Sequence, residues 1–145
     1  MALKVELKPG ERIIIGDCVI TNDAQRTRLF IEGKTPILRE KDILTADSAD
    51  TPAKRVYFAV QLMYLESDVD KHSEQFLKLS QDFLKAAPSS GSIVEQINNR
   101  ILTGDLYKAL KEAKALISHE EERLNHANIG SSGLWPDDAG NSSTT

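Results

Sequence analysis

The sequence has a single cysteine, Cys18, among its 145 residues, so no disulfide can form within the chain and no oxidising compartment is required. It also lacks any apolar run approaching the roughly 18 residues that a membrane-spanning helix needs. From Leu3 to Lys8, apolar and charged residues alternate, unlike the continuous apolar segment of a secretory signal peptide. We therefore expect a cytoplasmic protein that does not insert into a membrane.

An excess of positive charge is missing as well. The formal net charge is −4, and residues 1–50 contain eight basic and nine acidic residues. Non-specific binding of nucleic acid depends on a positive field around the protein. Any nucleic-acid binding must therefore come from the placement of individual basic side chains rather than from bulk charge.

The sequence lacks the residue groupings that are typical of catalytic and metal sites. Cys18 has no histidine near it in sequence, and a strand cysteine is more often a small core residue than a nucleophile. His119 and His126 lie beside acidic residues, but Arg123 occupies the position of the second histidine in an HExxH zinc motif. We expect no enzymatic activity, no bound metal and no cofactor.

What the sequence does contain is a series of short strand patterns in residues 1–50. Leu3, Val5 and Leu7 alternate with charged residues, which predicts a half-buried strand. Further strands are predicted at residues 12–15, 18–21, 27–32 and 37–39, separated by turn residues at Pro9-Gly10, Gly16-Asp17, Asn22-Asp23 and 33–36. About five short strands predict an antiparallel β-module that needs helices, or a second copy of itself, to cover one face.

Residues 51–127 have the pattern of a helical bundle. Thr51-Pro52 predicts a helix start, because an N-cap residue is followed by proline at the first helical position. Further helices are predicted from about Asp68 to Ala86, from Ser92 with Glu95 completing a capping box, and from Leu106 to about His126. Four helices with short links predict an antiparallel bundle, so the fold class is α+β.

The composition changes again at residues 128–145. Glycine, serine, asparagine, aspartate and threonine dominate this segment. Such a composition cannot bury enough apolar surface to fold, so we predict a disordered tail.

Basic residues in the β-module are the candidates for binding RNA. Their spacing along the strands would allow contacts with phosphates and base edges. Alternatively, these charges would only protect a solvent-exposed strand edge from pairing with another strand. Phe30 lies beside Arg28 on the predicted outer face, where it could stack on an unpaired base, or it could instead pack under the first helix. The candidate RNA-binding residues are Lys4, Arg26, Arg28, Arg39 and Lys41.

Several segments together form a specific sequence pattern. They are Lys8-Pro-Gly-Glu-Arg-Ile-Ile-Ile-Gly16, Val19-Ile-Thr-Asn22, Thr27-Arg-Leu-Phe-Ile-Glu-Gly33, Pro36-Ile-Leu-Arg-Glu-Lys-Asp-Ile-Leu44 and Ala53-Lys-Arg-Val-Tyr-Phe-Ala-Val-Gln-Leu-Met-Tyr-Leu65. On these segments the chain closely resembles the FlbT family, regulators of flagellum biogenesis in alphaproteobacteria. The resemblance covers about residues 1–125.

The resemblance implies a post-transcriptional function. FlbT-like proteins associate with the 5′ untranslated leader of flagellin mRNA and promote its decay, and the sign of control differs among species. They work with a small companion protein, FlaF, which acts in the opposite direction. The implied partners are therefore a flagellin message and a FlaF-like protein.

A second similarity concerns the β-module alone. Gly10-Glu-Arg-Ile-Ile-Ile-Gly-Asp17 and Arg39-Glu-Lys-Asp-Ile43 look like the carbon storage regulator CsrA, an interlocked dimer that binds loops in mRNA leaders. That family binds RNA along its first and last strands, and the matching positions here are Lys4 and Arg39. The chain departs from the CsrA pattern in its shorter strands between Gly16 and Thr27 and in the helices that follow.

Two functional hypotheses follow from the sequence. The first is a repressor whose β-module binds a single-stranded mRNA leader, while the helices bind a protein partner or dimerise. The second is a helical adaptor or chaperone that holds flagellin or FlaF and affects mRNA indirectly. The spacing of basic residues favours the first, and the acidic isoelectric point of about 5.4 favours the second.

Overall fold

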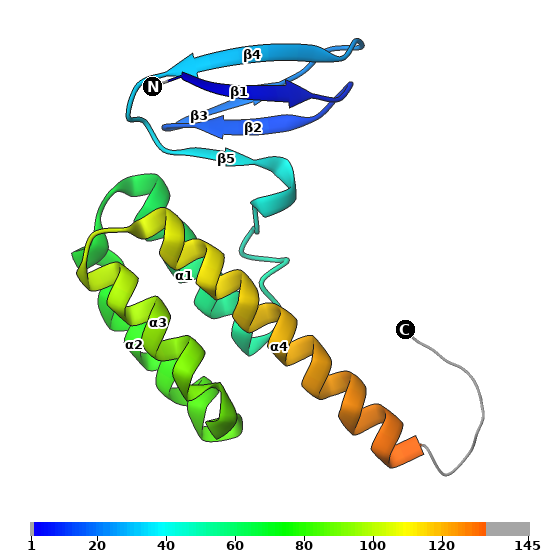
Figure 1. Ribbon diagram of the computed structural model, residues 1–145, viewed down its shortest axis with the longest axis vertical. Coiled ribbons are helices and arrows are strands. Elements are labelled where there is room, and N and C mark those ends of the chain that lie inside the picture. Colours follow the sequence, from blue (N-terminus) through cyan, green and yellow to red (C-terminus); the bar gives the residue numbers. More distant parts are fainter. Residues whose placement is uncertain (1, 133–145) are drawn as a thin grey trace.

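The computed structural model describes residues 2–132, with side chains through Asn125. Five strands come first and four helices follow, as Figure 1 shows, so the α+β prediction is confirmed. Within the described residues, none of the helices has the length and apolar character needed to cross a bilayer.

The β-module consists of two small antiparallel sheets that pack face to face. Strand β1 (Ala2–Leu7) pairs with β4 (Thr27–Glu32), and β2 (Arg12–Ile15) lies between β3 (Cys18–Thr21) and β5 (Ile37–Arg39). Val5, Leu7 and Ile13 are buried between the two sheets. This arrangement follows from the alternation of apolar and polar residues, because successive side chains of a strand point to opposite faces.

Turn residues fix the strand ends where the sequence predicted them. Gly16 has a φ of +63° and is followed by Asp17 in the two-residue link between β2 and β3, which is the glycine position of a type II′ hairpin turn. A side chain at Gly16 would also meet Thr35, since an added Cβ would lie 2.8 Å from its methyl carbon. The Asn22 side-chain amide donates to the carbonyls of Leu7, Lys8 and Gln25, which ties the link after β3 to the end of β1.

The first helix begins at the predicted cap, Thr51, and the second begins directly after Asp68, where its start was predicted. Helix α1 (Pro52–Glu66) is capped by Thr51, whose side chain accepts from the Lys54 N–H at 3.2 Å. Helix α2 (Val69–Ala86) is capped in the same way by Asp68, which accepts from the Lys71 N–H at 3.1 Å. Both caps satisfy N–H groups that have no partner within the helix.

The remaining helices differ from the prediction at their ends. Helix α3 (Gly91–Leu102) follows a 3-10 turn, Pro88–Ser90, and therefore already begins before Ser92, so the predicted capping box is wrong. Helix α4 (Leu106–Ser132) continues past His126, so residues 128–132 are helical where a tail was predicted. The rest of the predicted tail, residues 133–145, lies outside the described residues.

The core of the bundle lies mainly between α1 and its neighbours α2 and α4, and α3 packs on α4. Val56, Val60 and Met63 of α1 are fully buried together with Leu116 of α4. The α1 N-terminus is also bound by α4, because the buried Glu120 carboxylate accepts from the Ala53 N–H at 3.1 Å. A carboxylate at this end of a helix is favoured by the helix dipole.

The bundle also covers one face of the three-stranded sheet. Leu38 of β5 is part of the helical core, and its cross-strand neighbour Ile14 packs against that core. Val19, the next residue along the same face, is 62% exposed. The helices therefore cover the β5 side of the sheet and leave the β3 side open.

Two side chains of α1 hold the β-module in place by pairing with backbone groups. The Tyr64 hydroxyl accepts from the Ile37 N–H at 3.1 Å and donates to the Ile37 carbonyl at 3.0 Å. The Gln61 amide does the same for Leu44, at 2.9 and 2.8 Å. These bonds give the outer edge of β5 and the chain after it the partners that a further strand would supply.

A candidate nucleic-acid interface between the sheets and the helices

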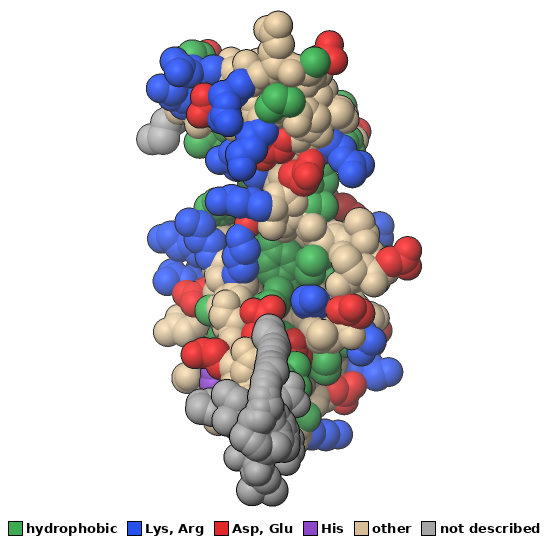
Figure 2. Space-filling model, turned by 90° about the vertical axis from the view of Figure 1, so that its right-hand side faces the viewer, with side chains coloured by type: hydrophobic (Ala, Val, Ile, Leu, Met, Phe, Trp, Pro, Cys, Tyr) green, Lys and Arg blue, Asp and Glu red, His purple; other side chains and the backbone are tan. Residues whose placement is uncertain are grey.

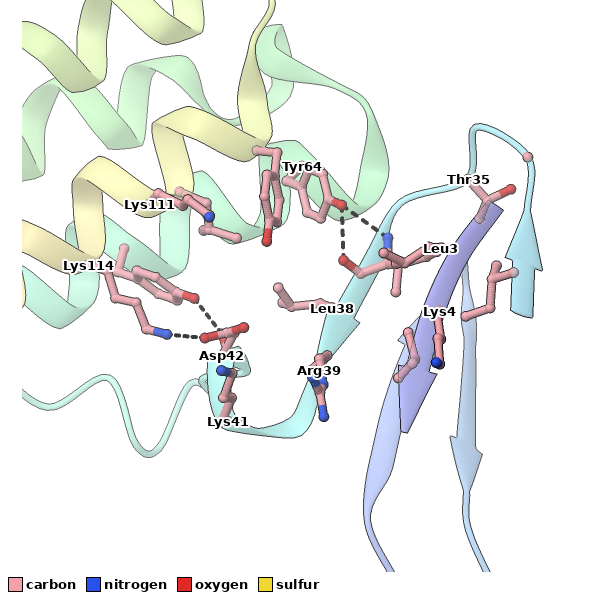
Figure 3. A pocket seen from close by; sticks show the side chains of 17 residues that line it. Leu3, Lys4, Thr35, Leu38, Arg39, Lys41, Asp42, Tyr64, Lys111 and Lys114 are labelled. Atoms are coloured by element: carbon pink, nitrogen blue, oxygen red, sulfur yellow. Dashed lines mark hydrogen bonds and ion pairs between the residues drawn. The ribbon is translucent and has the colours of Figure 1, made fainter. Parts of the chain in front are cut away.

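A groove of about 770 Å³ lies where the β-module meets the bundle. Figure 3 shows side chains from β1 and β5 on one side of it and from α4 on the other. Its lining residues are Leu3, Lys4, Val5, Ile31, Gly33, Thr35, Ile37, Leu38, Arg39, Lys41, Asp42, Tyr57, Tyr64, Tyr107, Leu110, Lys111 and Lys114.

The groove is positively charged although the whole chain is acidic. Asp42 is the one carboxylate among the lining residues that the structure describes, whereas five are cations. These cations are Lys4, Arg39, Lys41, Lys111 and Lys114, which gives a net charge of +4 in a chain of −4. Figure 2 shows Lys and Arg side chains gathered along one side of the molecule, over the β-module and over the adjoining part of the helices. The arrangement can attract an anionic chain.

Three tyrosines form the aromatic part of the lining. Tyr107 is 46% exposed, and the Lys111 ammonium lies 5.2 Å from its ring centroid. Its ring also lies against Tyr64, with the centroids 5.8 Å apart. Tyr107 is thus held from the side while much of its surface is accessible from the groove.

Asp42 joins the β-module to both helices that border the groove. The 3-10 turn Glu40–Asp42 (η1) carries it, the Tyr57 hydroxyl donates to its carbonyl, and Lys114 pairs with its carboxylate. Burial, followed by the nearby Asp42 and Tyr107, raises the pKa of Tyr57, so its hydroxyl is a neutral donor. Burial likewise raises the pKa of Tyr64, against the lowering effect of its bond to Ile37.

The structure brings together three of the five predicted RNA-binding residues. Lys4 of β1, Arg39 of β5 and Lys41 of η1 all line the groove, although Lys4 and Arg39 lie on different sheets. Arg26 and Arg28 are not part of the lining. They lie at the strand β4 side of the module, where Arg28 is the cross-strand partner of Glu6 and Arg26 pairs with the same carboxylate at 3.8 Å.

Arg39 is more constrained than an exposed strand arginine. Its Nη2 donates to the Glu6 carbonyl at 3.0 Å and lies 3.8 Å from the Glu11 carboxylate. The side chain is 40% exposed. Arg39 therefore ties β5 to β1 as well as lining the groove.

Phe30 does not pack under the first helix. It is 68% exposed on the outer face of β4, so the alternative in which it packs under the first helix is wrong. Leu29 and Ile31, on the opposite face, are the residues that pack between the two sheets.

The α4 side of the groove was not predicted from the sequence. Tyr107, Lys111 and Lys114 have spacings of four and three, which place them on one face of a helix. This pattern was visible in the sequence, but nothing local indicated that the face would lie against β5. Among the described residues, no group of three His, Cys, Asp or Glu side chains is arranged to hold a metal.

Comparison with known proteins matches residues 3–124 to the family described as "Flagellar protein FlbT". The chain belongs to the FlbT family. One relative is "Probable flagellum biosynthesis repressor protein FlbT 1" of Bradyrhizobium diazoefficiens, 58% identical over 123 residues that make up 84% of each chain. A Rhodopseudomonas palustris FlbT is 51% identical over 86% of this chain and 99% of its own.

A more distant relative is "Flagellum biosynthesis repressor protein FlbT" of Caulobacter vibrioides, 36% identical over 90% of this chain and 94% of its own. No solved structure matches. All of the groove-lining residues, from Leu3 to Lys114, lie within the residues that match the family.

Proposed function

We propose that this FlbT protein is a post-transcriptional repressor of flagellum biogenesis, acting in the cytoplasm on the 5′ untranslated leader of flagellin mRNA. Its relatives are named flagellum biosynthesis repressors, which supports repression as the outcome. The finer steps of the proposal are association with the leader and promotion of its degradation.

The observation that supports RNA binding is the concentration of cations in the groove. Five cationic side chains surround a single carboxylate in a protein that is acidic overall. Non-specific binding of nucleic acid would require a protein with a net positive charge. A local row of cations instead favours the binding of a single nucleic-acid strand within the groove. The phosphates of the leader would lie along Lys4, Lys41 and Lys111.

An unpaired strand fits this groove better than a duplex does. The lining combines cations with an accessible tyrosine, Tyr107, and with apolar side chains such as Leu3 and Leu110. Single-stranded RNA is typically recognised by such a mixture, because its bases are free to stack on aromatic rings while its phosphates meet basic residues. A leader loop or an unpaired end is therefore the proposed target.

Degradation would be carried out by another protein. The described residues contain no constellation suited to cutting RNA, so the proposed contribution of this chain is occupancy of the leader. Occupancy would block ribosome entry or hold the message in a form that a nuclease attacks.

The test is a binding titration of the purified protein against a flagellin leader and a scrambled leader, at two salt concentrations. Each phosphate contact contributes about −0.7 to the log–log salt slope for a single strand, so contacts from Lys4, Lys41 and Lys111 predict a slope of about −2.1. Leader-selective, salt-sensitive binding is expected. Equal weak binding of both RNAs would refute direct leader recognition.

A matched pair of variants locates the site. Lys41→Gln with Lys111→Gln removes two groove cations, whereas Lys78→Gln with Lys85→Gln removes two exposed cations from α2. Both double variants change the net charge equally. We expect the first to weaken leader binding and reduce the salt slope, and the second to leave both near the wild-type values.

A second candidate function is an adaptor whose helices bind flagellin, a FlaF-like companion protein or a second copy of the chain. The net charge of −4 favours it, because the chain outside the positively charged groove is net negative. Absence of leader binding by the protein alone, together with capture of purified flagellin or FlaF, would support this candidate instead.

A further inference from the structure

Phe30 is the most exposed aromatic side chain that the structure describes, and the proposed groove does not include it. It is 68% exposed, compared with 46% for Tyr107. Exposure of a phenylalanine ring to water is unfavourable by the usual measure of about 25 cal/mol per Å² of apolar surface. An exposed ring in this position is accessible to a ligand that would cover its apolar surface.

The strand register places Phe30 next to the groove. Its direct cross-strand partner on β1 is Lys4, which itself lines the groove. Directly opposed residues of an antiparallel pair have Cβ atoms about 5 Å apart. Lys4 therefore lies between the groove and Phe30, and an extended chain leaving the groove over the edge of β1 would meet the ring next.

The residues around Phe30 indicate which kind of ligand fits. The same face of the β1–β4 ribbon carries alternate residues of both strands, and Phe30 is the one large apolar side chain among them. The others, in register, are Ala2, Lys4 and Glu6 on β1 and Arg28 and Glu32 on β4. A docking surface for a protein has a contiguous apolar centre, which this face lacks.

Charge on this face is also balanced, in contrast to the groove. Lys4 and Arg28 are offset by Glu6 and Glu32. Such a face attracts a phosphate backbone weakly, so a ligand would be bound there through the ring itself. An isolated aromatic ring flanked by Lys and Arg on an open strand face is suited to stacking on a nucleobase.

We propose that Phe30 stacks on an unpaired base of the RNA strand that the groove holds, with the strand crossing the edge of β1 at Lys4. This inference rests on the proposed function, because it concerns where the RNA bound in the groove continues beyond it. The ligand class is single-stranded RNA long enough to reach from the groove to Phe30.

The test uses two variants of the full-length chain. Phe30→Leu keeps an apolar side chain but removes the flat ring, and we expect leader affinity to fall about tenfold, within the range typical of one base–aromatic stack. The salt slope should not change, because no phosphate contact is lost. Unchanged thermal unfolding shows that each variant is folded.

Phe30→Trp supplies a direct readout of stacking. In a Trp135→Phe background the new indole is the sole tryptophan, and a base stacked on it quenches its fluorescence. We expect quenching by the single-stranded leader and none by the same leader annealed to its complement. Val19→Trp in the same background places an indole on the exposed edge strand β3, away from Lys4, and should not be quenched.

The outcomes separate the two levels of the proposal. If the wild-type protein binds the leader but Phe30→Leu binds it within twofold and the fluorescence of Phe30→Trp is not quenched, the stacking assignment is overturned while the groove stands. If Phe30→Leu reduces the salt slope along with affinity, the effect is not stacking and the assignment is again overturned. Absence of leader binding by the wild-type protein overturns the proposed function, and this inference with it.

Discussion

Replacement of Gln61 by leucine tests how the β-module is joined to the bundle. Gln61 is 3% exposed on α1, and its side-chain amide pairs with both backbone groups of Leu44. Leucine has a similar volume and is well tolerated in a helix. The substitution therefore removes the two hydrogen bonds without creating a large cavity.

The expected magnitude follows from what is lost and what is regained. An unsatisfied buried polar group costs roughly 1–3 kcal/mol, and Gln61→Leu leaves the part-buried Leu44 N–H and carbonyl without their partner. The apolar leucine surface recovers about 1 kcal/mol. Two such groups cost about 2–6 kcal/mol, so after this recovery we expect the free energy of unfolding to fall by about 1–5 kcal/mol. For a chain of this size each kcal/mol shifts Tm by roughly 3 °C, so Tm should fall by about 3–15 °C.

The assay is urea and thermal unfolding followed by far-UV circular dichroism. Gln81→Leu is the matched control, because Gln81 is exposed on α2 and its replacement should change stability by less than about 0.5 kcal/mol. If Gln61→Leu were as stable as the control, the Gln61 bonds would not join the module to the bundle, and the reasoning would be refuted.

Three further predictions follow from the same contacts. Val60→Asp places a charge at a fully buried position of α1, so the chain should fail to fold, and a wild-type Tm would contradict the helix assignment. The raised pKa values of Tyr57 and Tyr64 favour their neutral forms in the folded state, so their contribution to stability is present below about pH 10 and is lost as the pH rises further. The free energy of unfolding of the double variant Tyr57→Phe, Tyr64→Phe, measured between pH 8 and about pH 11, should therefore depend less on pH than that of the wild type. Asp42→Asn removes the groove carboxylate and frees Lys114, so leader affinity at low salt should rise, whereas the same change at the exposed Asp82 should leave it unchanged.

The strands and the first helix cap could be predicted because their causes are local. Strands β2 to β5 have the predicted bounds, since alternation and turn glycines such as Gly16 are read within a few residues. Thr51 acts as the predicted cap for the same reason, and the second helix begins after Asp68, close to its predicted start. The start of α3 was missed because Pro88 forms a 3-10 turn that leads into the helix before Ser92, and such a turn has a weaker sequence pattern than a cap box.

The groove could not be predicted because its two sides are far apart in sequence. Lys4 and Arg39 were identified as candidates, but Lys111 lies on a helix about 70 residues after Arg39. The pairing of Tyr64 with Ile37 and of Gln61 with Leu44 places β5 against α1, and α4 packs on α1. Periodicity within a helix predicts which residues share a face, but what that face packs against depends on tertiary contacts.

The division of the groove between the two halves of the chain has a consequence for how RNA binding would be controlled. Lys4, Arg39 and Lys41 come from the β-module and its 3-10 turn, while Lys111 and Lys114 come from α4. Their separation is set by the contacts of Gln61 and Tyr64 and by the Lys114–Asp42 pair, because these contacts join the two halves.

Any partner that binds the helices and shifts α4 relative to α1 would change the spacing of the cations without touching them. A protein partner at the bundle and an RNA at the groove would then affect each other's affinity equally, as linkage requires. The two functional hypotheses, RNA-binding repressor and helical adaptor, are therefore compatible states of one molecule, and leader affinity measured with and without a bundle-binding partner distinguishes coupled from independent sites.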